Sequence, residues 1–124
     1  MVGLTIQIYI TDVLKAYEHY KRAFNSSINF TGKGSQDELI HLEFDLYGNK
    51  IALAPAAQHE IAKGNTRFPN ITMICLNFKD KESLIQAYNV LKEDVHADEL
   101  RVFPWSELSG GVTDKFGVSW CLSL

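Results

Sequence analysis

The sequence predicts an α+β protein in which one strand–helix–strands unit is used twice. Apolar residues alternate with polar ones along several short segments, which is typical of half-buried strands. Two other segments carry apolar residues at spacings of three and four, which is typical of amphipathic helices. Equivalent landmarks also recur about 68 residues apart. They are the pairs Asp12 and Asp80, Tyr20 and Tyr88, and Tyr47-Gly48 and Phe116-Gly117.

The first half begins with a strand and a helix. Leu4–Ile10 has leucine or isoleucine at every second position, so these side chains share one face of a strand. Asp12 supplies an N-cap oxygen for the helix that follows. The helix is expected over roughly 12–25, with one apolar stripe made of Val13, Tyr17, Tyr20 and Phe24.

Three short strands are expected to complete the first half. They are Ile28–Thr31, Leu39–Tyr47 and Lys50–Ala54. Gly48-Asn49 has the composition of a tight hairpin turn between the last two. The segment Pro55–Asn70 lacks periodicity and predicts a long surface loop.

The second half repeats this plan. Residues 73–78 alternate as a strand, and Asp80 caps a helix whose stripe contains Leu84, Ala87, Tyr88 and Leu91. Val102-Phe103 predicts a further strand. Gly110-Gly111 predicts a flexible break. Val118–Leu124 alternates again and predicts the final strand.

Length and composition indicate one globular domain spanning 1–124, with module one at about 1–58 and module two at about 68–124. Hydrophobic residues make up 46% of the chain, and the net charge is −3. The sequence has no cluster of basic residues, so a nucleic-acid partner is not expected. No apolar run is long enough to cross a membrane. The N-terminal segment lacks a signal-peptide pattern. With only two cysteines, a cytoplasmic protein is expected.

Three segments resemble a known family. They are Ala16–Phe24, Ile40–Phe44 and Gly111–Trp120, of which the last is the most specific. Its residues Asp114-Lys115-Phe116-Gly117-Val118-Ser119-Trp120 resemble a closing Asp-x-Phe-Gly-x-x-Trp pattern. Over essentially its whole length, the chain resembles the PhnB-type branch of the vicinal oxygen chelate superfamily. That superfamily includes glyoxalase I, extradiol dioxygenases and bleomycin-resistance proteins.

The resemblance implies two tandem βαβββ modules that form a curved mixed sheet around a ligand cavity, with helices on the convex face. It also implies a homodimer. An apolar set is then expected to face the helices: Leu4, Ile6, Ile8, Ile10, Ile40, Leu42, Phe44, Ile74, Leu76, Phe78, Trp120 and Leu122. A polar set is expected to face the cavity: Thr5, Gln7, Tyr9, His41, Glu43, Met73, Cys75, Asn77, Ser119 and Cys121.

Relatives with metal-dependent chemistry hold a divalent ion with His and Glu side chains from four strands. The matching positions fall on Thr5, Met73, Cys121 and Ala52, or Ala54 if the register slips. The same-face neighbours Gln7, Cys75 and Ser119 fit no better. These residue types do not form a His/Glu ligand set, so neither a metal nor another cofactor is expected.

One alternative metal site lies on a single strand face, where His41, Glu43 and Asp45 project together. Because no second ligand pair is evident, a polar strand face is the preferred interpretation.

His41 and Glu43 are instead the candidate acid–base or substrate-orienting pair, since residues two apart on a strand point the same way. Hydrogen bonding across the sheet is the alternative. The candidate ligand-binding residues are Gln7, Tyr9, Cys75, Asn77, Trp105 and Cys121. Trp105 is expected beside a mobile glycine segment, at a cavity mouth, with packing or a dimer contact as the alternative. The cysteines are either reactive thiols or small apolar residues. His19, His59 and His96 are expected at the surface.

The leading functional hypothesis is a small-molecule binder with a metal-free cavity. The first alternative is a metal-independent lyase, isomerase or hydrolase that uses His41 and Glu43. The second is a divalent-metal-dependent enzyme of the glyoxalase or dioxygenase type.

Overall fold

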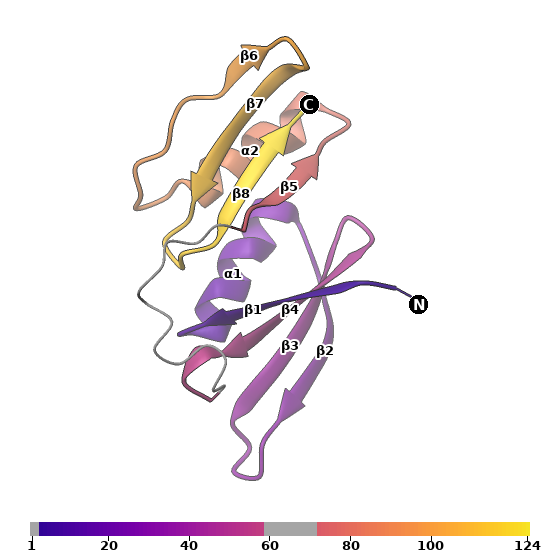
Figure 1. Ribbon diagram of the computed structural model, residues 1–124. Coiled ribbons are helices and arrows are strands. Elements are labelled where there is room, and N and C mark those ends of the chain that lie inside the picture. The colour runs from indigo at the N-terminus through magenta and orange to yellow at the C-terminus, as the bar shows by residue number, and fades with distance from the viewer. Residues whose placement is uncertain (1–2, 59–71) are drawn as a thin grey trace. The chain divides into compact units, whose positions relative to one another are not determined.

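The structure is a computed structural model that describes residues 3–58 and 72–124 (Figure 1). The chain divides into two compact units, unit 1 over Met1–Phe68 and unit 2 over Pro69–Leu124. Each unit contains one α-helix and one four-stranded mixed sheet. This arrangement confirms the α+β class predicted from the sequence. His59 and most of the predicted loop Pro55–Asn70 lie outside the described residues.

Unit 1 consists of a strand, a helix and three further strands. They are β1 (Thr5–Ile10), α1 (Val13–Phe24), β2 (Ile28–Lys33), β3 (Leu39–Leu46) and β4 (Asn49–Pro55), followed by the 3-10 turn η1 (Ala56–Gln58). The strand order is β1-β4-β3-β2. The edge strand β1 pairs parallel with β4, and the other pairs are antiparallel. The central strand β4 therefore brings the two ends of the unit together.

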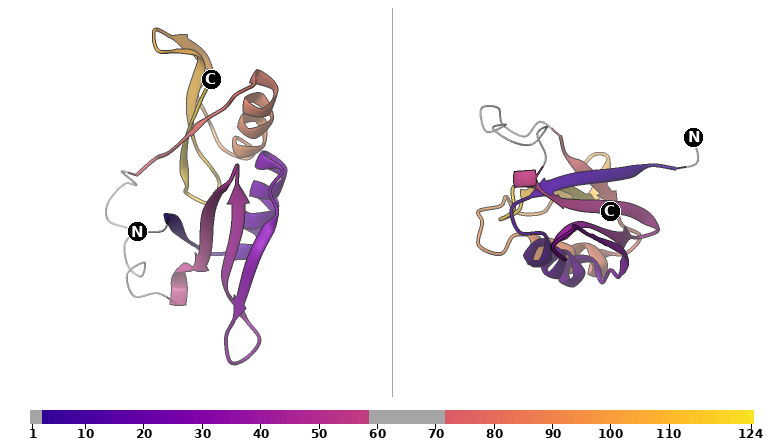
Figure 2. Two further views of the ribbon diagram at one scale, coloured as in Figure 1. Left: turned by 90° about the vertical axis from the view of Figure 1, so that its right-hand side faces the viewer. Right: turned by 90° about the horizontal axis from the view of Figure 1, so that it is seen from below.

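Unit 2 repeats the topology of unit 1. Its elements are β5 (Ile74–Asn77), α2 (Lys81–Leu91), β6 (Arg101–Phe103), β7 (Ser106–Thr113) and β8 (Ser119–Ser123). The strand order is β5-β8-β7-β6, with β5 parallel to β8. In each unit the helix lies along one face of that unit's own sheet (Figures 1 and 2). The predicted repeat is thus confirmed at the level of topology.

Both helices begin at the predicted aspartates. Asp12 Oδ1 accepts a hydrogen bond from the Lys15 N–H at 3.1 Å. Asp80 accepts one from the Ser83 N–H at 2.7 Å and one from the Ser83 hydroxyl at 3.0 Å, and these bonds lower the Asp80 pKa. Each cap satisfies a backbone donor that the first helical turn leaves unpaired. Within residues 3–58 and 72–124, neither helix is long and apolar enough to span a membrane.

Aromatic side chains fill the space between α1 and its sheet. The Tyr17 and Tyr20 rings lie 5.7 and 6.0 Å from the Phe44 ring on β3, between centroids. Phe24 lies 6.2 Å from Tyr20. Tyr20 and Phe44 are fully buried. The helical stripe read from the sequence is therefore the stripe that packs on the sheet.

The expected surface position of His19 is wrong. Only 3% of this residue is exposed, and its ring lies 5.9 Å from the Tyr20 ring. The buried face of α1 also includes Ala16 and Ala23, so it is wider than the aromatic stripe alone. His19 falls within this wider arc.

The predicted division of the sheet faces holds for part of the apolar set. Ile10, Leu42 and Phe44 are buried in unit 1, as Phe78, Trp120 and Leu122 are in unit 2. Leu4 and Ile6 are exposed instead, by 76% and 37%. They lie at and before the start of the edge strand β1, whereas α1 packs on β3 and β4. Position on the sheet, which alternation alone does not reveal, decides their exposure.

The hairpin between β3 and β4 turns one residue earlier than predicted. Tyr47 and Gly48 form the turn, with φ of 51° and 87°. Two consecutive positive φ values are typical of a type I′ turn, whose twist suits two paired strands. Asn49 is already the first residue of β4 and pairs with Leu46. Gly117, the predicted counterpart of Gly48, also has a φ of 87°.

Gly110 and Gly111 do not form a flexible break. Both lie inside β7, where they pair with Leu122 and Cys121. A Cβ on Gly110 would lie 3.0 Å from the Leu100 side chain, so glycine leaves room for Leu100 against the strand. The prediction failed because a glycine pair also occurs where another group approaches a strand closely.

The specific Asp-x-Phe-Gly-x-x-Trp segment closes around one buried carboxylate. Asp114, only 3% exposed, accepts hydrogen bonds at Oδ1 from the Phe116 and Val118 N–H groups, at 2.9 and 3.0 Å. Its Oδ2 accepts one from Trp120 Nε1 at 2.9 Å. The Trp120 side chain is fully buried. Asp114 therefore determines both the β7–β8 turn and the position of the largest core residue in unit 2.

Replacing Asp114 with alanine should destabilise the protein by about 3 kcal/mol or more, because two buried donors and one partly buried donor lose their acceptor. Asp114→Asn should cost less, since its amide oxygen still accepts. Denaturant unfolding followed by Trp fluorescence measures both. The control is Asp94→Asn, which keeps a residue type that tolerates the φ of 64° at this position. The 77% exposed Asp94 side chain contacts Lys115 at the surface, so the effect should stay within about 0.5 kcal/mol. Equal losses at Asp114 and Asp94 would contradict the structural role of Asp114.

Candidate functional site

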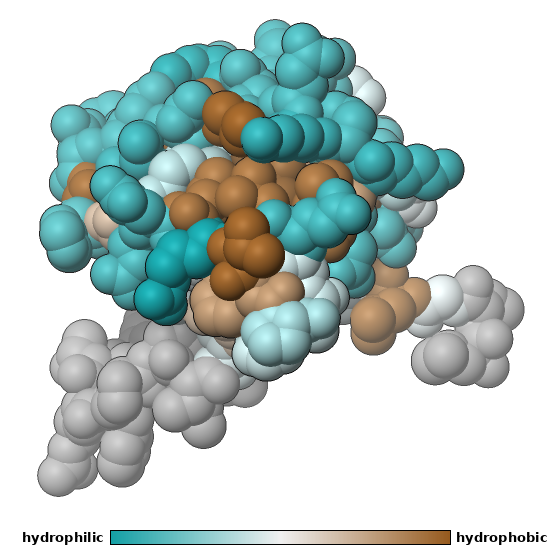
Figure 3. Space-filling view, turned by 90° about the horizontal axis from the view of Figure 1, so that it is seen from above, coloured by the Kyte–Doolittle hydropathy of each residue, from teal (hydrophilic) through white to brown (hydrophobic). Residues whose placement is uncertain are grey.

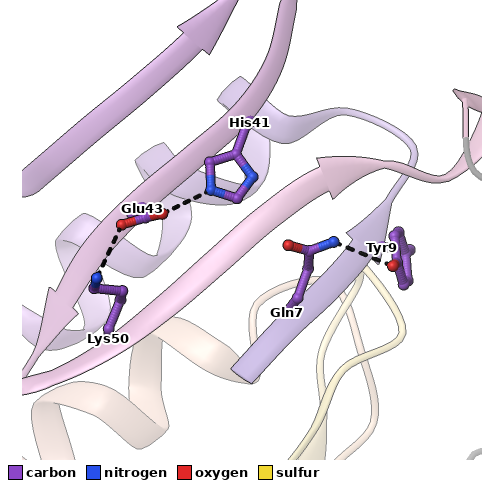
Figure 4. Close-up of polar contacts among 5 residues, drawn as sticks. All are labelled: Gln7, Tyr9, His41, Glu43 and Lys50. Atoms are coloured by element: carbon purple, nitrogen blue, oxygen red, sulfur yellow. Dashed lines mark hydrogen bonds and ion pairs between the residues drawn. The ribbon is translucent and has the colours of Figure 1, made fainter. Parts of the chain in front are cut away.

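Sheet register brings four of the predicted site residues onto one face of unit 1. Gln7 pairs with Ala52 across β1 and β4, and Ala52 pairs with Glu43 across β4 and β3. Paired residues point to the same side of a sheet, as do residues two apart on one strand. Tyr9 and His41 therefore share this face with Gln7 and Glu43, as the close-up shows (Figure 4).

A charged network joins β3 to β4 on this face. His41 Nε2 lies 2.8 Å from Glu43 Oε2, and Lys50 Nζ lies 3.4 Å from Glu43 Oε1. The His41 and Glu43 side chains are 28% and 20% exposed. The Glu43 carboxylate thus lies between two basic groups, and solvent still reaches the network.

Both neighbours favour the ionised form of Glu43. The hydrogen bond with His41 is the largest cause that lowers the Glu43 pKa, and Lys50 lowers it further, against a smaller opposing effect of burial. An ionised carboxylate only accepts hydrogen bonds, so His41 Nε2 is the donor. In a neutral His41 ring, Nδ1 is then left as an acceptor. The arrangement can accept a proton or a hydrogen bond from a bound molecule at Nδ1.

A second polar pair lies across β4 from the first. Gln7 Nε2 donates to the Tyr9 hydroxyl oxygen at 3.1 Å. Between the two pairs, β4 contributes only the methyl groups of Ala52 and Ala54, both of which are buried. The longer side chains of β1 and β3, together with Lys50 at the start of β4, are therefore the groups that reach away from the sheet.

Phe30 adds an apolar group beside His41. The two rings lie 6.1 Å apart between centroids in an edge-to-face arrangement, and Phe30 is 53% exposed. Gly32 pairs with His41 across β2 and β3. A Cβ at Gly32 would lie in ordinary contact with the Phe30 ring and with His41 Cβ, at 3.5 and 3.4 Å, so these three positions are immediate neighbours. The face offers apolar contact next to its polar groups.

In unit 2, Cys75, Asn77 and Cys121 also share one sheet face. Cys75 pairs with Cys121 across β5 and β8, and Asn77 pairs with Ser123. Burial and the neighbouring Cys121 raise the pKa of the Cys75 thiol, so this thiol stays protonated near neutrality. A protonated thiol is a weak nucleophile. The register thus brings the two cysteines together on one face of the sheet.

Trp105 lies apart from the two cysteines within unit 2. It belongs to the turn between β6 and β7, is 77% exposed, and stacks on Phe103 with 5.1 Å between ring centroids. Its surroundings form an open groove of about 510 Å³ whose lining includes Phe78, Val102 and Leu124. Figure 3 looks onto this end of unit 2 and shows apolar side chains gathered there. Because Gly110 and Gly111 belong to β7, the expected mobile segment beside Trp105 is wrong.

Comparison with solved structures identifies the fold. The PhnB protein of Bacillus cereus matches with a TM-score of 0.77 and 21% identity, over 99% of this chain and 98% of that one. The chain has the glyoxalase/bleomycin resistance/dioxygenase fold. Lactoylglutathione lyase of Agrobacterium tumefaciens matches with a TM-score of 0.66 and 15% identity, over 97% and 90% of the two chains. FosX of Listeria monocytogenes matches with a TM-score of 0.70 and 16% identity, over 99% and 92%. No protein-family profile and no curated protein matches the chain.

These neighbours all belong to the vicinal oxygen chelate superfamily, as the sequence resemblance predicted. The FosX structure contains Mn(II) and 1S,2S-dihydroxypropylphosphonic acid. By the sequence resemblance, the positions expected to match the metal ligands of the metal-dependent relatives carry Thr5, Met73, Cys121 and Ala52, or Ala54 if the register slips. Their hydroxyl, methyl, thioether and thiol groups do not fit a site that needs imidazole and carboxylate ligands. Within residues 3–58 and 72–124, no three His, Cys, Asp or Glu side chains gather as a metal site.

Lys50 and Phe30 are site residues that sequence reasoning missed. Lys50 begins the predicted strand after the hairpin, and its pairing with Asp45 places it one step from Glu43 on the same face. Counting outward from the Tyr47-Gly48 turn would have revealed this placement. Phe30 carried no comparable signal, because register shifts interrupt the β2–β3 pairing.

The carboxyl pKa of Glu43 should lie below its ordinary value of 4.5. Because Glu43 in the unfolded chain binds a proton more readily than in the folded protein, the network stabilises the fold at pH values above the ordinary pKa. The contribution is lost as the pH falls through the folded value. Carboxyl ¹³C NMR titration measures the shift. His41→Ala should move the pKa upward more than Lys50→Ala does, because the His41 hydrogen bond is its largest cause. An unshifted Glu43 in the wild type would contradict the network.

Proposed function

We propose that the protein binds a small organic molecule on the unit 1 face formed by Gln7, Tyr9, His41, Glu43 and Lys50. One observation carries this proposal. Two polar pairs stand on either side of Ala52 and Ala54, so their hydrogen-bonding groups are aimed at the same side of the sheet (Figure 4). A few convergent polar groups beside apolar surface are what small-molecule sites generally contain.

The chemistry of the face suggests the kind of ligand. His41 Nδ1 accepts a hydrogen bond from a hydroxyl or N–H group, and Lys50 attracts an anionic group. Phe30 supplies an exposed ring for apolar contact. A compact hydroxylated acid or phenol combines these properties. Binding through these side chains needs no bridging metal ion.

A second candidate function is proton transfer without a metal. An ionised carboxylate that holds one nitrogen of a histidine orients the other nitrogen as a general base. Glu43 and His41 have this geometry at 2.8 Å. A lyase or isomerase that removes a proton from a bound acid would use His41 as the base and Glu43 as its positioning residue.

Binding is tested by titrating the protein, free of added metal, with hydroxy acids, phenols and 1S,2S-dihydroxypropylphosphonic acid while recording amide NMR spectra. Shifts should gather on β1, β3 and β4. His41→Ala should weaken binding about tenfold or more, because the ligand loses its hydrogen bond to the His41 ring. Lys33→Ala, a change at a surface side chain that is 55% exposed, should leave affinity unchanged. Shifts confined to unit 2 would overturn the proposal.

Turnover separates the two candidates. If the protein is an enzyme, His41→Gln should lower kcat by about 100-fold or more, as expected for loss of a general base. The thermal midpoint should change little. If the protein only binds, compounds that shift the unit 1 signals should be recovered unchanged after prolonged incubation. Turnover that survives His41→Gln would exclude His41 as the base.

A further inference from the structure

Three sulfur atoms gather on the polar face of the unit 2 sheet. Cys75 on β5 pairs with Cys121 on β8, and Cys121 also pairs with Gly111 on β7. A Cβ added to Gly111 would lie 3.5 Å from the terminal methyl of Met73. The Met73 side chain therefore extends from the start of β5 across β8 towards Gly111 on β7. Its thioether and the two thiols occupy one side of the sheet.

The neighbours of these sulfurs are neutral and are already paired with one another. On one side, the Ser109 and Ser123 hydroxyls lie 2.7 Å apart. On the other side, the Thr113 and Ser119 hydroxyls lie 2.8 Å apart. No carboxylate, imidazole or ammonium group occupies these three rows, whose residues are all described. A hard cation has no suitable ligand here, whereas thiolate and thioether sulfur are the ligands that soft cations prefer.

We propose that Cys75, Cys121 and Met73 form a binding site for a soft monovalent cation, Cu(I). Cys75 is exposed and Cys121 is half-buried, so a cation can reach both sulfurs. On binding, each thiol loses its proton to solvent and its sulfur forms one metal bond. Met73 adds a neutral third bond, and copper keeps its oxidation state.

The spacing of the paired strands suits a bridging ion. Neighbouring strands lie about 4.8 Å apart, and paired side chains stand roughly perpendicular to the sheet. A disulfide draws its two Cβ atoms to about 3.8 Å. A metal ion adds about 2.3 Å for each sulfur and so spans the wider gap without moving the strands. The thioether of Met73 disfavours Zn²⁺, which takes Cys, His and carboxylate ligands.

The test uses reduced, oxygen-free protein and Cu(I) supplied as its coloured bicinchoninate complex. Loss of colour should report one Cu(I) per chain. Cys75→Ser or Cys121→Ser should weaken binding roughly 100-fold, and Met73→Leu about tenfold, as expected when one ligand is removed. Ser123→Ala is the matched control, because this hydroxyl lies 4.0 Å from Cys121 Sγ and is not a ligand in the proposed site.

Three results would overturn the site. Equal affinity of wild type and Met73→Leu would show that the thioether takes no part. Full displacement of Cu(I) by equimolar Zn²⁺ would show that the site is not soft. A rapid two-dalton mass loss with peroxide, without copper uptake in the reduced protein, would show a disulfide pair instead.

Unfolded protein in urea should lose the dependence of copper affinity on Met73, since only the folded sheet brings the three sulfurs together. His41→Ala should leave copper binding unchanged. A negative copper result therefore does not affect the proposal for unit 1, and a negative result there does not affect the copper site.

Discussion

The arrangement of unit 2 depends on one buried carboxylate. Asp114 ties the backbone of the β7–β8 connection to the indole of Trp120, which fills the core beneath β8. Because residues alternate along a strand, fixing Trp120 toward the helix places Cys121 on the opposite face. The same register sets Cys121 beside Gly111 and Cys75. Asp114 thereby helps to determine which side chains of unit 2 share the sheet face opposite the helix.

The two units show how one topology carries different chemistry. The central strand contributes Ala52 and Ala54 in unit 1, and Cys121 and Ser123 in unit 2. On this face of unit 1, Ala52 and Ala54 are small, so the long polar side chains come from β1, from β3 and from Lys50 at the start of β4. In unit 2 the central strand itself carries the Cys121 thiol. The units thus share a backbone plan and differ in hydrogen-bonding and sulfur chemistry.

Local patterns predicted the elements well, because local physics determines them. Alternation marked the strands, and Asp12 and Asp80 marked the helix starts through bonds made within one turn. The grouping of Gln7 and Tyr9 with His41 and Glu43 came from the family resemblance, since it depends on the crossover from β1 to β4. The role of Lys50 and the inclusion of Gly110 in a strand were missed. Both depend on which strand lies alongside, and a single sequence does not state this.

The parallel pairing of the first and last strands of each unit has a consequence for cooperativity. Cys75 and Cys121 are paired although a helix and two strands separate them in sequence, because β5 and β8 are the first and last strands of the unit. The same holds for Gln7 and Glu43, which meet through β4. Forming such long-range contacts costs loop-closure entropy, which a molecule bound across either row would help to offset. Ligand binding would therefore strengthen the attachment of the edge strand in that unit.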